Sequence, residues 1–377
     1  MTAQVDADNK RVEYLYDELN RRTDHVQKKS SGDLTTTFGY DENGNRTSLL
    51  DAKGQSYAYV YDALNRETSR TFPTGNGPYL TIQSIATDYD ANNNVTTITE
   101  TKIQSGGGTV TDVTTNSYDR LDRLQTSTQR GRTITYAYDN NGNRTGVSTD
   151  AGNTIYTFDT RNRLKTAVAG TETSTYTYFA DGKLDNVIYP NGTVMSNRYD
   201  DADRTTQVKT VKTSDNSVIS QLDYQYDRNG NRTQQSELQG GQTDTTTYVY
   251  DNADRLTQFT LTKADAGVTA TTYTLDNVAN RLTEVTTEAA TTTIDKTYDY
   301  DDTHWLTKVT DNLKTQSIDY TYDANGNTIH KVDNTQASPQ STVFTYDSRD
   351  QLVQVIRGPP GSESDNLVLS LCLPDDR

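Results

Sequence analysis

Four near-identical segments place aspartate and asparagine at alternate positions, the spacing by which side-chain oxygens open a calcium loop. They are YDENGNRT (40–47), YDNNGNRT (138–145), YDRNGNRT (226–233) and YDANGNTI (322–329). An EF-hand loop also needs glycine at position 6 and glutamate at position 12. Here the glycine is fourth, and position 12 holds Ala52, Asp150, Leu238 or Asn334. We therefore predict no metal site in these segments.

Histidine, cysteine and serine offer no nucleophilic or zinc-binding arrangement. The three histidines, His25, His304 and His330, stand far apart, and no G-x-S-x-G, H-E-x-x-H or C-x-x-C occurs. The only cysteine, Cys372, lies in an apolar run and is interpreted as a small hydrophobic residue. The sequence predicts no catalytic residue, no metal and no cofactor.

Abundant carboxylates leave a glycosidase open, since two of them about 5–9 Å apart can hydrolyse a glycosidic bond. Most of the aspartates, however, follow a tyrosine in one recurring pattern. Repeats found along a whole chain indicate one architecture built from a single unit. About fifteen copies occur, and their first residues are Tyr16, Tyr40, Tyr61, Tyr89, Tyr118, Tyr138, Phe158, Tyr178, Tyr199, Tyr226, Tyr250, Leu275, Tyr300, Tyr322 and Tyr346.

The position three residues after the usual aspartate is restricted to residues that tolerate a left-handed backbone. Fourteen of the fifteen copies carry Gly, Asn, Asp or His there, and one carries Ala279. An aspartate that opens a type I turn can accept the amide of the residue two ahead, and the left-handed residue then reverses the chain. The predicted structural turn residues in the clearest copies are Asp41, Gly44, Asp139, Gly142, Asp227, Gly230, Asp323 and Gly326.

Another aromatic residue usually precedes the motif aromatic by two positions. A spacing of two places both rings on one face of a strand and excludes a helix, whose neighbours are three or four apart. We expect rings of successive hairpins to stack along that face. The predicted structural aromatics are Tyr136, Tyr138, Tyr224, Tyr226, Tyr320 and Tyr322.

Composition supports a sheet with an aromatic core. Only 31% of the residues are apolar, and 26 tyrosines stand against 6 phenylalanines. Turn-rich segments such as 51–55 and 238–242 join one hairpin to the next. We predict an all-β fold, a long antiparallel meander of hairpins that curls into a spiral or open β-shell because neighbouring strands twist. The array is expected over residues 1–356, followed by a non-repeat tail at 357–377.

Charge and hydropathy restrict the partners and the location. A net charge of −16 would repel a phosphate backbone, so nucleic acid is not an expected partner. The sequence contains no run of 18 apolar residues, so we predict no membrane insertion. The first residues lack the apolar stretch of a signal peptide. We expect a protein that is cytoplasmic before export and then secreted or displayed at the cell surface by another route.

The YDxxGNRT units resemble the YD repeats of bacterial RHS proteins, which also occur in the C component of Tc toxins and in teneurins. The resemblance covers about residues 12–356. It implies a hollow β-shell, which in the bacterial toxins encloses a C-terminal toxic domain, and sugar binding has been associated with such repeats. The tail after Ile356 has no DPxGL-like signature and no length for a toxin domain, so the resemblance is partial and self-cleavage is not carried over.

Two functions follow from these observations. The first is a non-catalytic structural shell segment that encapsulates or presents a toxin or effector polypeptide, located in the same or a neighbouring chain. The alternative is a carbohydrate-binding adhesion module that contacts cell-surface glycans through exposed tyrosine faces and the polar groups of the turns.

Overall fold

The computed structural model describes residues 2–73, 81–103, 108–335, 338–347, 349–360 and 367–370. Within these ranges every regular element is a β-strand. No helix in the described part of the chain is long and apolar enough to cross a membrane. The many tyrosine, threonine and valine residues account for the all-strand structure, because such residues suit a pleated, half-buried surface.

The described residues form 32 strands. The first sixteen are β1 (Thr2–Val5), β2 (Arg11–Tyr16), β3 (Arg22–Gln27), β4 (Leu34–Tyr40), β5 (Arg46–Leu50), β6 (Ser56–Tyr61), β7 (Glu67–Thr71), β8 (Thr81–Tyr89), β9 (Val95–Ile103), β10 (Thr109–Tyr118), β11 (Leu124–Gln129), β12 (Arg132–Tyr138), β13 (Arg144–Thr149), β14 (Gly152–Phe158), β15 (Leu164–Ala169) and β16 (Glu172–Tyr178). The others are β17 (Leu184–Tyr189), β18 (Thr193–Tyr199), β19 (Thr205–Lys212), β20 (Val218–Tyr226), β21 (Arg232–Gln239), β22 (Gln242–Tyr250), β23 (Leu256–Thr262), β24 (Val268–Leu275), β25 (Arg281–Glu288), β26 (Thr291–Tyr300), β27 (Leu306–Asp311), β28 (Gln316–Tyr322), β29 (Thr328–Asp333), β30 (Gln340–Tyr346), β31 (Leu352–Gly358) and β32 (Leu367–Ser370).

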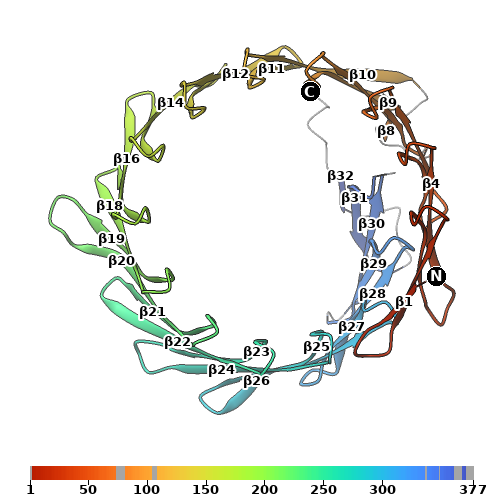
Figure 1. Ribbon diagram of the computed structural model, residues 1–377. Coiled ribbons are helices and arrows are strands. Elements are labelled where there is room, and N and C mark those ends of the chain that lie inside the picture. The colour runs from red at the N-terminus through yellow and green to blue at the C-terminus, as the bar shows by residue number, and fades with distance from the viewer. Residues whose placement is uncertain are drawn as a thin grey trace. The chain divides into compact units, whose positions relative to one another are not determined.

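Strands that follow one another in the chain pair antiparallel, so the sheet is a meander of hairpins (Figure 1). Two kinds of turn alternate along it. Motif turns follow the repeat aromatic, as between β12 and β13, and linking turns join one repeat to the next, as between β13 and β14. The predicted all-β fold, a long antiparallel meander of hairpins, is confirmed.

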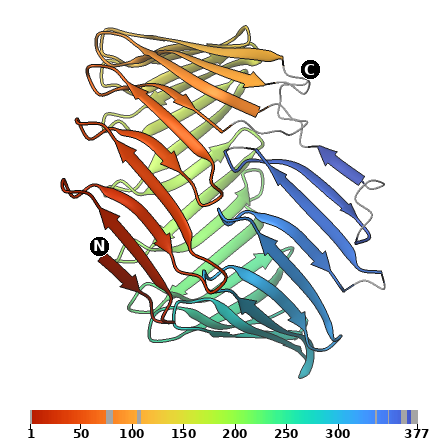
Figure 2. The same cartoon turned by 90° about the vertical axis from the view of Figure 1, so that its right-hand side faces the viewer.

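The chain divides into two compact units. The first contains Met1–Thr115, Leu275–Thr283 and Asp295–Arg377, and the second contains Asn116–Thr274 and Glu284–Ile294. In the second unit β11 to β23 form an uninterrupted run of hairpins. In the first unit the last repeats lie against the first ones. Turns between β26 and β31 meet turns between β1 and β6 (Figures 1 and 2).

The core of this sheet is thin. No residue in the described ranges is less than 2% exposed as a whole, and the most buried apolar one is Val187 at 2%. Along β12 Tyr136 and Tyr138 are half-buried. Ile134 lies two residues before Tyr136, and therefore on the same face of the strand, but it is exposed. The sheet is therefore a single layer, and strand pairing and side-chain contacts along its surface hold it together.

The strand pattern continues beyond the predicted array. β31 ends at Gly358, and β32 pairs with it in the sequence interpreted as a tail. Most of the tail, with Cys372, lies outside the described residues. The division at residue 356 stays a prediction.

Candidate functional site

Fourteen of the fifteen motif turns are built around an aspartate at their first position, and the turn that starts at Phe179 is the exception. The turn after β12 shows the arrangement. Asp139 Oδ1 accepts hydrogen bonds from the amides of Asn141 and Asn143, both at 2.9 Å. The Asp139 amide donates to the carbonyl of Asn143 at 3.0 Å, and the amide of Gly142 donates back to the Asp139 carbonyl at 3.2 Å. One carboxylate thus closes a five-residue turn, including the bond to the residue two ahead that the sequence suggested.

The corner residue of every motif turn has a positive φ. The predicted glycines Gly44, Gly142, Gly230 and Gly326 have φ of 89°, 90°, 94° and 90°. The other corners are Asn20, Asn65, Asn93, Asp122, Asn162, Gly182, Asp203, Asp254, Ala279, His304 and Asp350. Even Ala279 adopts φ of 75°, although a Cβ is unfavourable there. The turn therefore imposes its geometry on the corner residue.

Eleven of the motif tyrosines link their repeat to the preceding one. Tyr138 lies at a β-bulge, and its hydroxyl donates to the carbonyl of Leu124 at 2.9 Å. The same bond to the preceding repeat is made by Tyr40, Tyr61, Tyr89, Tyr178, Tyr199, Tyr226, Tyr250, Tyr300, Tyr322 and Tyr346. The structure thus gives Tyr138, Tyr226 and Tyr322 a polar partner as well as a place on the half-buried face.

In most motif turns the final residue links its repeat to the following one, and in six copies it is arginine. Arg123 Nε binds Asp119 Oδ2 at 2.7 Å, while Nη1 reaches the carbonyl of Asp139 in the next motif turn at 2.8 Å. Its guanidinium also lies 4.6 Å from the ring centroid of Tyr138. Such a side chain needs only backbone from the next turn, whose corner here is Gly142.

Asparagine performs the same linkage over a shorter reach in six other copies. Asn143 Nδ2 binds its own Asp139 Oδ2 at 2.8 Å and Asn162 Oδ1, at the next corner, at 2.9 Å. Asn231 and Asn327 likewise reach the side chains of Asp254 and Asp350. A short amide needs a polar side chain at the next corner, whereas arginine tolerates glycine there. We call this series of contacts the turn ladder.

Sequence reasoning missed the turn ladder, although its signal is present. Asparagine or arginine ends twelve of the fifteen motif turns. The expected contacts between aromatic rings of successive repeats are present in part: Phe179 and Tyr199 meet edge-on with ring centroids 6.1 Å apart, and Trp305 and Tyr322 lie 5.4 Å apart. At other tyrosines the ring faces a cation instead. The partner over Tyr138, Tyr178, Tyr224 or Tyr226 is a guanidinium, at 4.6, 4.4, 4.3 and 4.8 Å from the ring centroid. A cation fits because the face of a tyrosine ring is negative.

Hydrogen bonds hold turn carboxylates such as Asp159 and Asp139 in their charged form. The side-chain hydrogen bond from Arg163 lowers the pKa of Asp159 to about 2, and the amide of Arg163 adds to the effect. The side chain of Asn143 likewise lowers the pKa of Asp139. The structural role and the ionised state of these aspartates are therefore linked.

Within the first unit, linking turns of the first repeats meet motif turns of the last repeats. We call these contacts the seam. Lys10 binds Asp302 at 2.8 Å, Lys29 binds Asp301 at 2.6 Å, and Lys53 binds Asp350 at 2.8 Å and Asp323 at 3.3 Å. Neutral groups add hydrogen bonds from Asn277 to Asp8, from Asn325 to Asp51 and from the Ser30 amide to Asp302.

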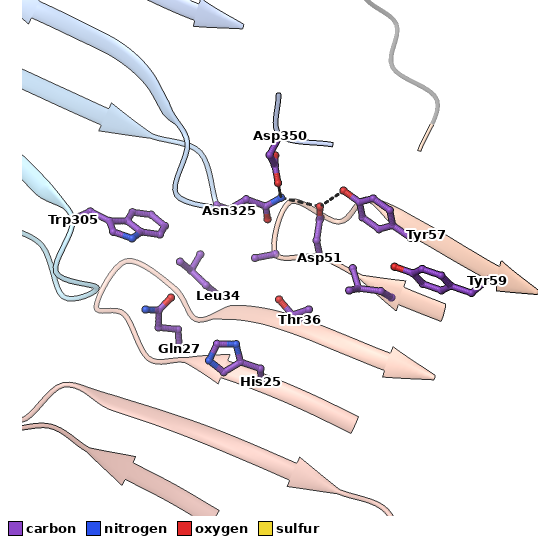
Figure 3. A pocket seen from close by; sticks show the side chains of 13 residues that line it. His25, Gln27, Leu34, Thr36, Asp51, Tyr57, Tyr59, Trp305, Asn325 and Asp350 are labelled. Carbon is purple, nitrogen blue, oxygen red and sulfur yellow. Dashed lines mark hydrogen bonds between the residues drawn. The ribbon is translucent and has the colours of Figure 1, made fainter. Parts of the chain in front are cut away.

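A cavity of about 390 Å³ opens beside the seam (Figure 3). His25, Gln27 and Thr36 on β3 and β4 line one side, and Trp305 and Asn325 of the late motif turns line the other. Burial lowers the pKa of His25, so its imidazole is neutral at pH 7. Asn325 donates to both Asp51 and Asp350, which places an amide between two carboxylates. Burial also raises the pKa of Tyr57, whose hydroxyl donates to Asp51.

The two other histidines are held by hydrogen bonds. His304 Nε2 lies 2.6 Å from Asp6 Oδ2, and its Nδ1 lies 2.9 Å from Asn280 Nδ2. Asp8 and Asp276 stand close enough to share an ion with His304, but both ring nitrogens of His304 are already engaged. His330 meets Ser341, a serine only 5% exposed that a substrate could not reach.

Comparisons with known proteins agree with the repeat. A family model described as RHS Repeat matches residues 40–76 and 118–155, and one described as Teneurin YD-shell matches residues 217–358. No curated protein matches the sequence significantly.

Among solved structures, 98% of the chain aligns with a chain of the crystal structure of TcdB2-TccC3, at 15% identity and a TM-score of 0.45. The same complex without its hypervariable C-terminal region aligns over 96% of the chain, at 14% identity and a TM-score of 0.48. A Photorhabdus luminescens Tc holotoxin pore aligns over 96%, at 14% identity and a TM-score of 0.42. The chain spans about a quarter of the length of these proteins, 25%, 26% and 25% respectively.

Replacing Tyr138 by phenylalanine tests the backward link of the motif. Loss of the hydroxyl leaves the Leu124 carbonyl without its donor, so we expect a cost of about 0.5–1.5 kcal/mol in the free energy of opening around β11 and β12. Hydrogen exchange monitored by mass spectrometry measures this. Tyr136→Phe is the matched control, because within the described residues the Tyr136 hydroxyl makes no hydrogen bond. Equal effects of the two changes would contradict the linking role.

The turn carboxylates predict a dependence of stability on pH. Asp159 has a pKa of about 2 in the folded chain against an ordinary value of 3.8. A depressed pKa gives stability that is complete above the ordinary value and is lost as the pH falls through the folded value. The thermal midpoint should therefore fall between about pH 4 and pH 2. The Asp159→Asn variant should be less stable than the native chain at neutral pH, and the gap should narrow across the same range.

Proposed function

Because the chain belongs to the family of RHS and YD-repeat proteins, we propose that it is a non-catalytic shell segment that encloses or presents a polypeptide cargo. The observation that carries the proposal is a single-layer sheet whose tyrosine face has no second layer over it within the described residues. When one face of a sheet is more apolar than the other, that face is normally buried against other protein.

The two faces of the sheet differ in a way that supports this role. Val147 and Tyr136 form a cross-strand pair on the tyrosine face, and both are half-buried. The neighbouring pair, Ser148 with Thr135, lies on the opposite face and is exposed and polar. Hydroxyl pairs such as Thr157 with Thr166 continue this polar face. This opposite face also carries exposed aliphatic side chains, among them Val60, Ile155 and Val249. The tyrosine face carries the aromatic rings, and we take it as the face that contacts a cargo.

The chemistry of the turns supports a structural role over a catalytic one. Both carboxylate oxygens of Asp139 are engaged by the turn it closes, so this group has little freedom to act as an acid or a nucleophile. We propose that the chain belongs to a protein that is exported or displayed at the cell surface. Toxin or effector polypeptides are the cargo that this assignment favours.

Photo-crosslinking tests the choice of face. In a Cys372→Ser background, the Val147→Cys and Ser148→Cys variants place a reactive label on opposite faces at adjacent positions. With a small globular reporter domain fused to the C-terminus, Val147→Cys should crosslink to the reporter and Ser148→Cys should not. The reporter should also resist protease better in the fusion than when mixed with the chain as a separate protein. Crosslinks from Ser148→Cys alone, with an unprotected reporter, would refute the proposal.

The cavity beside the seam favours carbohydrate binding as a second candidate function. The Gln27 amide, the Thr36 hydroxyl and the Trp305 indole N–H make no hydrogen bond within the described residues, and they lie near aromatic rings. Neutral donors and acceptors beside flat apolar surfaces suit the hydroxyl groups and apolar faces of a sugar.

A glycan array tests this candidate. We expect binding that falls at least severalfold in Gln27→Ala, while Gln129→Ala on β11, outside the cavity, leaves it unchanged. The absence of any signal above background from the native chain would remove the candidate.

A further inference from the structure

One late motif turn departs from the repeat at two successive positions. Residues 301–305 place His304 at the corner and Trp305 at the end, where the other turns mostly carry Gly, Asn or Asp and then Asn or Arg. The backbone of the turn is unchanged, since the Trp305 and Thr303 amides still donate to Asp301 Oδ1. The departures therefore do not serve the hairpin itself.

Trp305 leaves one oxygen of Asp301 open for a residue of another repeat. In a regular turn the final Asn or Arg occupies the second carboxylate oxygen, as Asn327 does at Asp323. An indole at this position makes no such bond, and Lys29 binds Asp301 Oδ2 at 2.6 Å instead. The same ammonium lies 4.8 Å from the centre of the Trp305 ring. The substitution thus replaces a contact within the turn by a contact across the seam.

The Trp305 ring is also packed against the next motif turn. A Cβ added to Gly326 would come within 3.0 Å of the indole, so glycine at this corner gives the ring its space. The ring thus contacts both Lys29 and Gly326. The ion pair beside it is largely covered, because the side chains of Lys29 and Asp301 are only 19% and 16% exposed. Trp305 therefore sits within the seam and is the only tryptophan of the chain.

His304 keeps the turn ladder and adds a seam contact. The Asn280 amide donates to Nδ1, as an asparagine does to the next corner elsewhere, which assigns the remaining N–H to Nε2. Nε2 then donates to Asp6 Oδ2 at 2.6 Å. A glycine corner has no side chain, and an aspartate corner has no donor, so neither could combine an acceptor for the ladder with a donor directed at the first linking turn. Asparagine has both groups but on a shorter side chain than histidine, whose two nitrogens lie on opposite sides of a ring.

The seam contacts described above differ in kind from the pairing of neighbouring strands. Each uses at least one side chain, and three lysines form ion pairs whose members are 16–33% exposed. Part-exposed ion pairs contribute little individually and weaken as salt screens them, whereas backbone ladders do not depend on charge in this way. The seam should therefore be the first part of the first unit to yield as ionic strength rises.

We propose that residues 301–305 form a releasable latch, in which Trp305, Asp301, Asp302 and His304 hold the first linking turns and let them go at high ionic strength while the strands stay paired. The latch itself rests only on the seam. Its use, parting the array to release a cargo, rests on the proposed function.

Hydrogen exchange at Ser30 reads the latch directly, because the Ser30 amide donates to Asp302 Oδ2 at 3.0 Å. Lys29→Met should raise exchange in a peptide spanning residues 28–33 by roughly two- to fivefold, the range for one part-exposed ion pair. Lys28→Met is the matched control, since Lys28 binds Glu13 and Asp33 within its own hairpins. In the native chain, added sodium chloride should shift Trp305 fluorescence before the circular dichroism of the strands changes.

A return to the common repeat sequence supplies a sharper test. The double change His304→Gly with Trp305→Asn should preserve the hairpin of β26 and β27 but speed exchange at residues 6–10 and 28–33. Ala279→Gly makes the equivalent corner change in the neighbouring turn, where the side chain makes no seam contact, and should leave both segments protected. Unchanged exchange in the double variant, or fluorescence and circular dichroism that change together with salt, would overturn the latch.

The outcomes for latch and cargo are separable. Protease resistance of the fused reporter that is lost at the salt concentration of the fluorescence change supports release through the seam. A reporter unprotected at every salt concentration counts against the proposed function and leaves the exchange result to decide the latch. A reporter protected at every salt concentration, despite seam opening, overturns the release role.

Discussion

The carboxylate that closes fourteen of the fifteen motif turns is the constraint on which the rest of the structure depends. Asp139 binds two amides ahead of it and holds Gly142 in a left-handed conformation, so one residue fixes where the chain reverses. That reversal places Tyr138 against the preceding repeat and Asn143 against the following one. A hairpin with its turn closed in this way already carries a link in each direction. Stability can therefore accumulate repeat by repeat without a thick hydrophobic core.

The local parts of this arrangement could be predicted from the sequence, because each rests on residues a few positions apart. The restriction to Gly, Asn, Asp or His predicted the corner conformation now seen at Gly44 and His304, and the spacing of two placed Tyr136 with Tyr138. The turn ladder was missed because its partners, such as Asn143 and Asn162, belong to different repeats. The seam could not be predicted at all, since Lys10 and Asp302 are 292 residues apart and no periodic pattern relates them.

Arginine explains how a sheet this poor in aliphatic residues keeps its tyrosine face ordered. Stacked rings alone would leave the polar hydroxyls to find partners by chance. Instead the guanidinium of Arg123 covers Tyr138, binds Asp119 and reaches the next turn. The cation binds the face of the ring and also pairs with the carboxylate, so each group has a partner of complementary charge. This is why the motif combines all three residue types.

Near-identical repeats create a problem that only irregular ones can solve. If every motif turn had the same surface, the first linking turns could dock one repeat earlier or later at little difference in energy. A contact that a shifted register cannot reproduce removes this degeneracy. His304 with Asp6 and Trp305 with Lys29 are contacts of that kind, because neighbouring turns offer Ala279 and Asn280 or Gly326 and Asn327 at the same positions. The least typical turn of the array is thus the one that fixes where its two ends meet in the first unit, and its ionic character makes that meeting reversible.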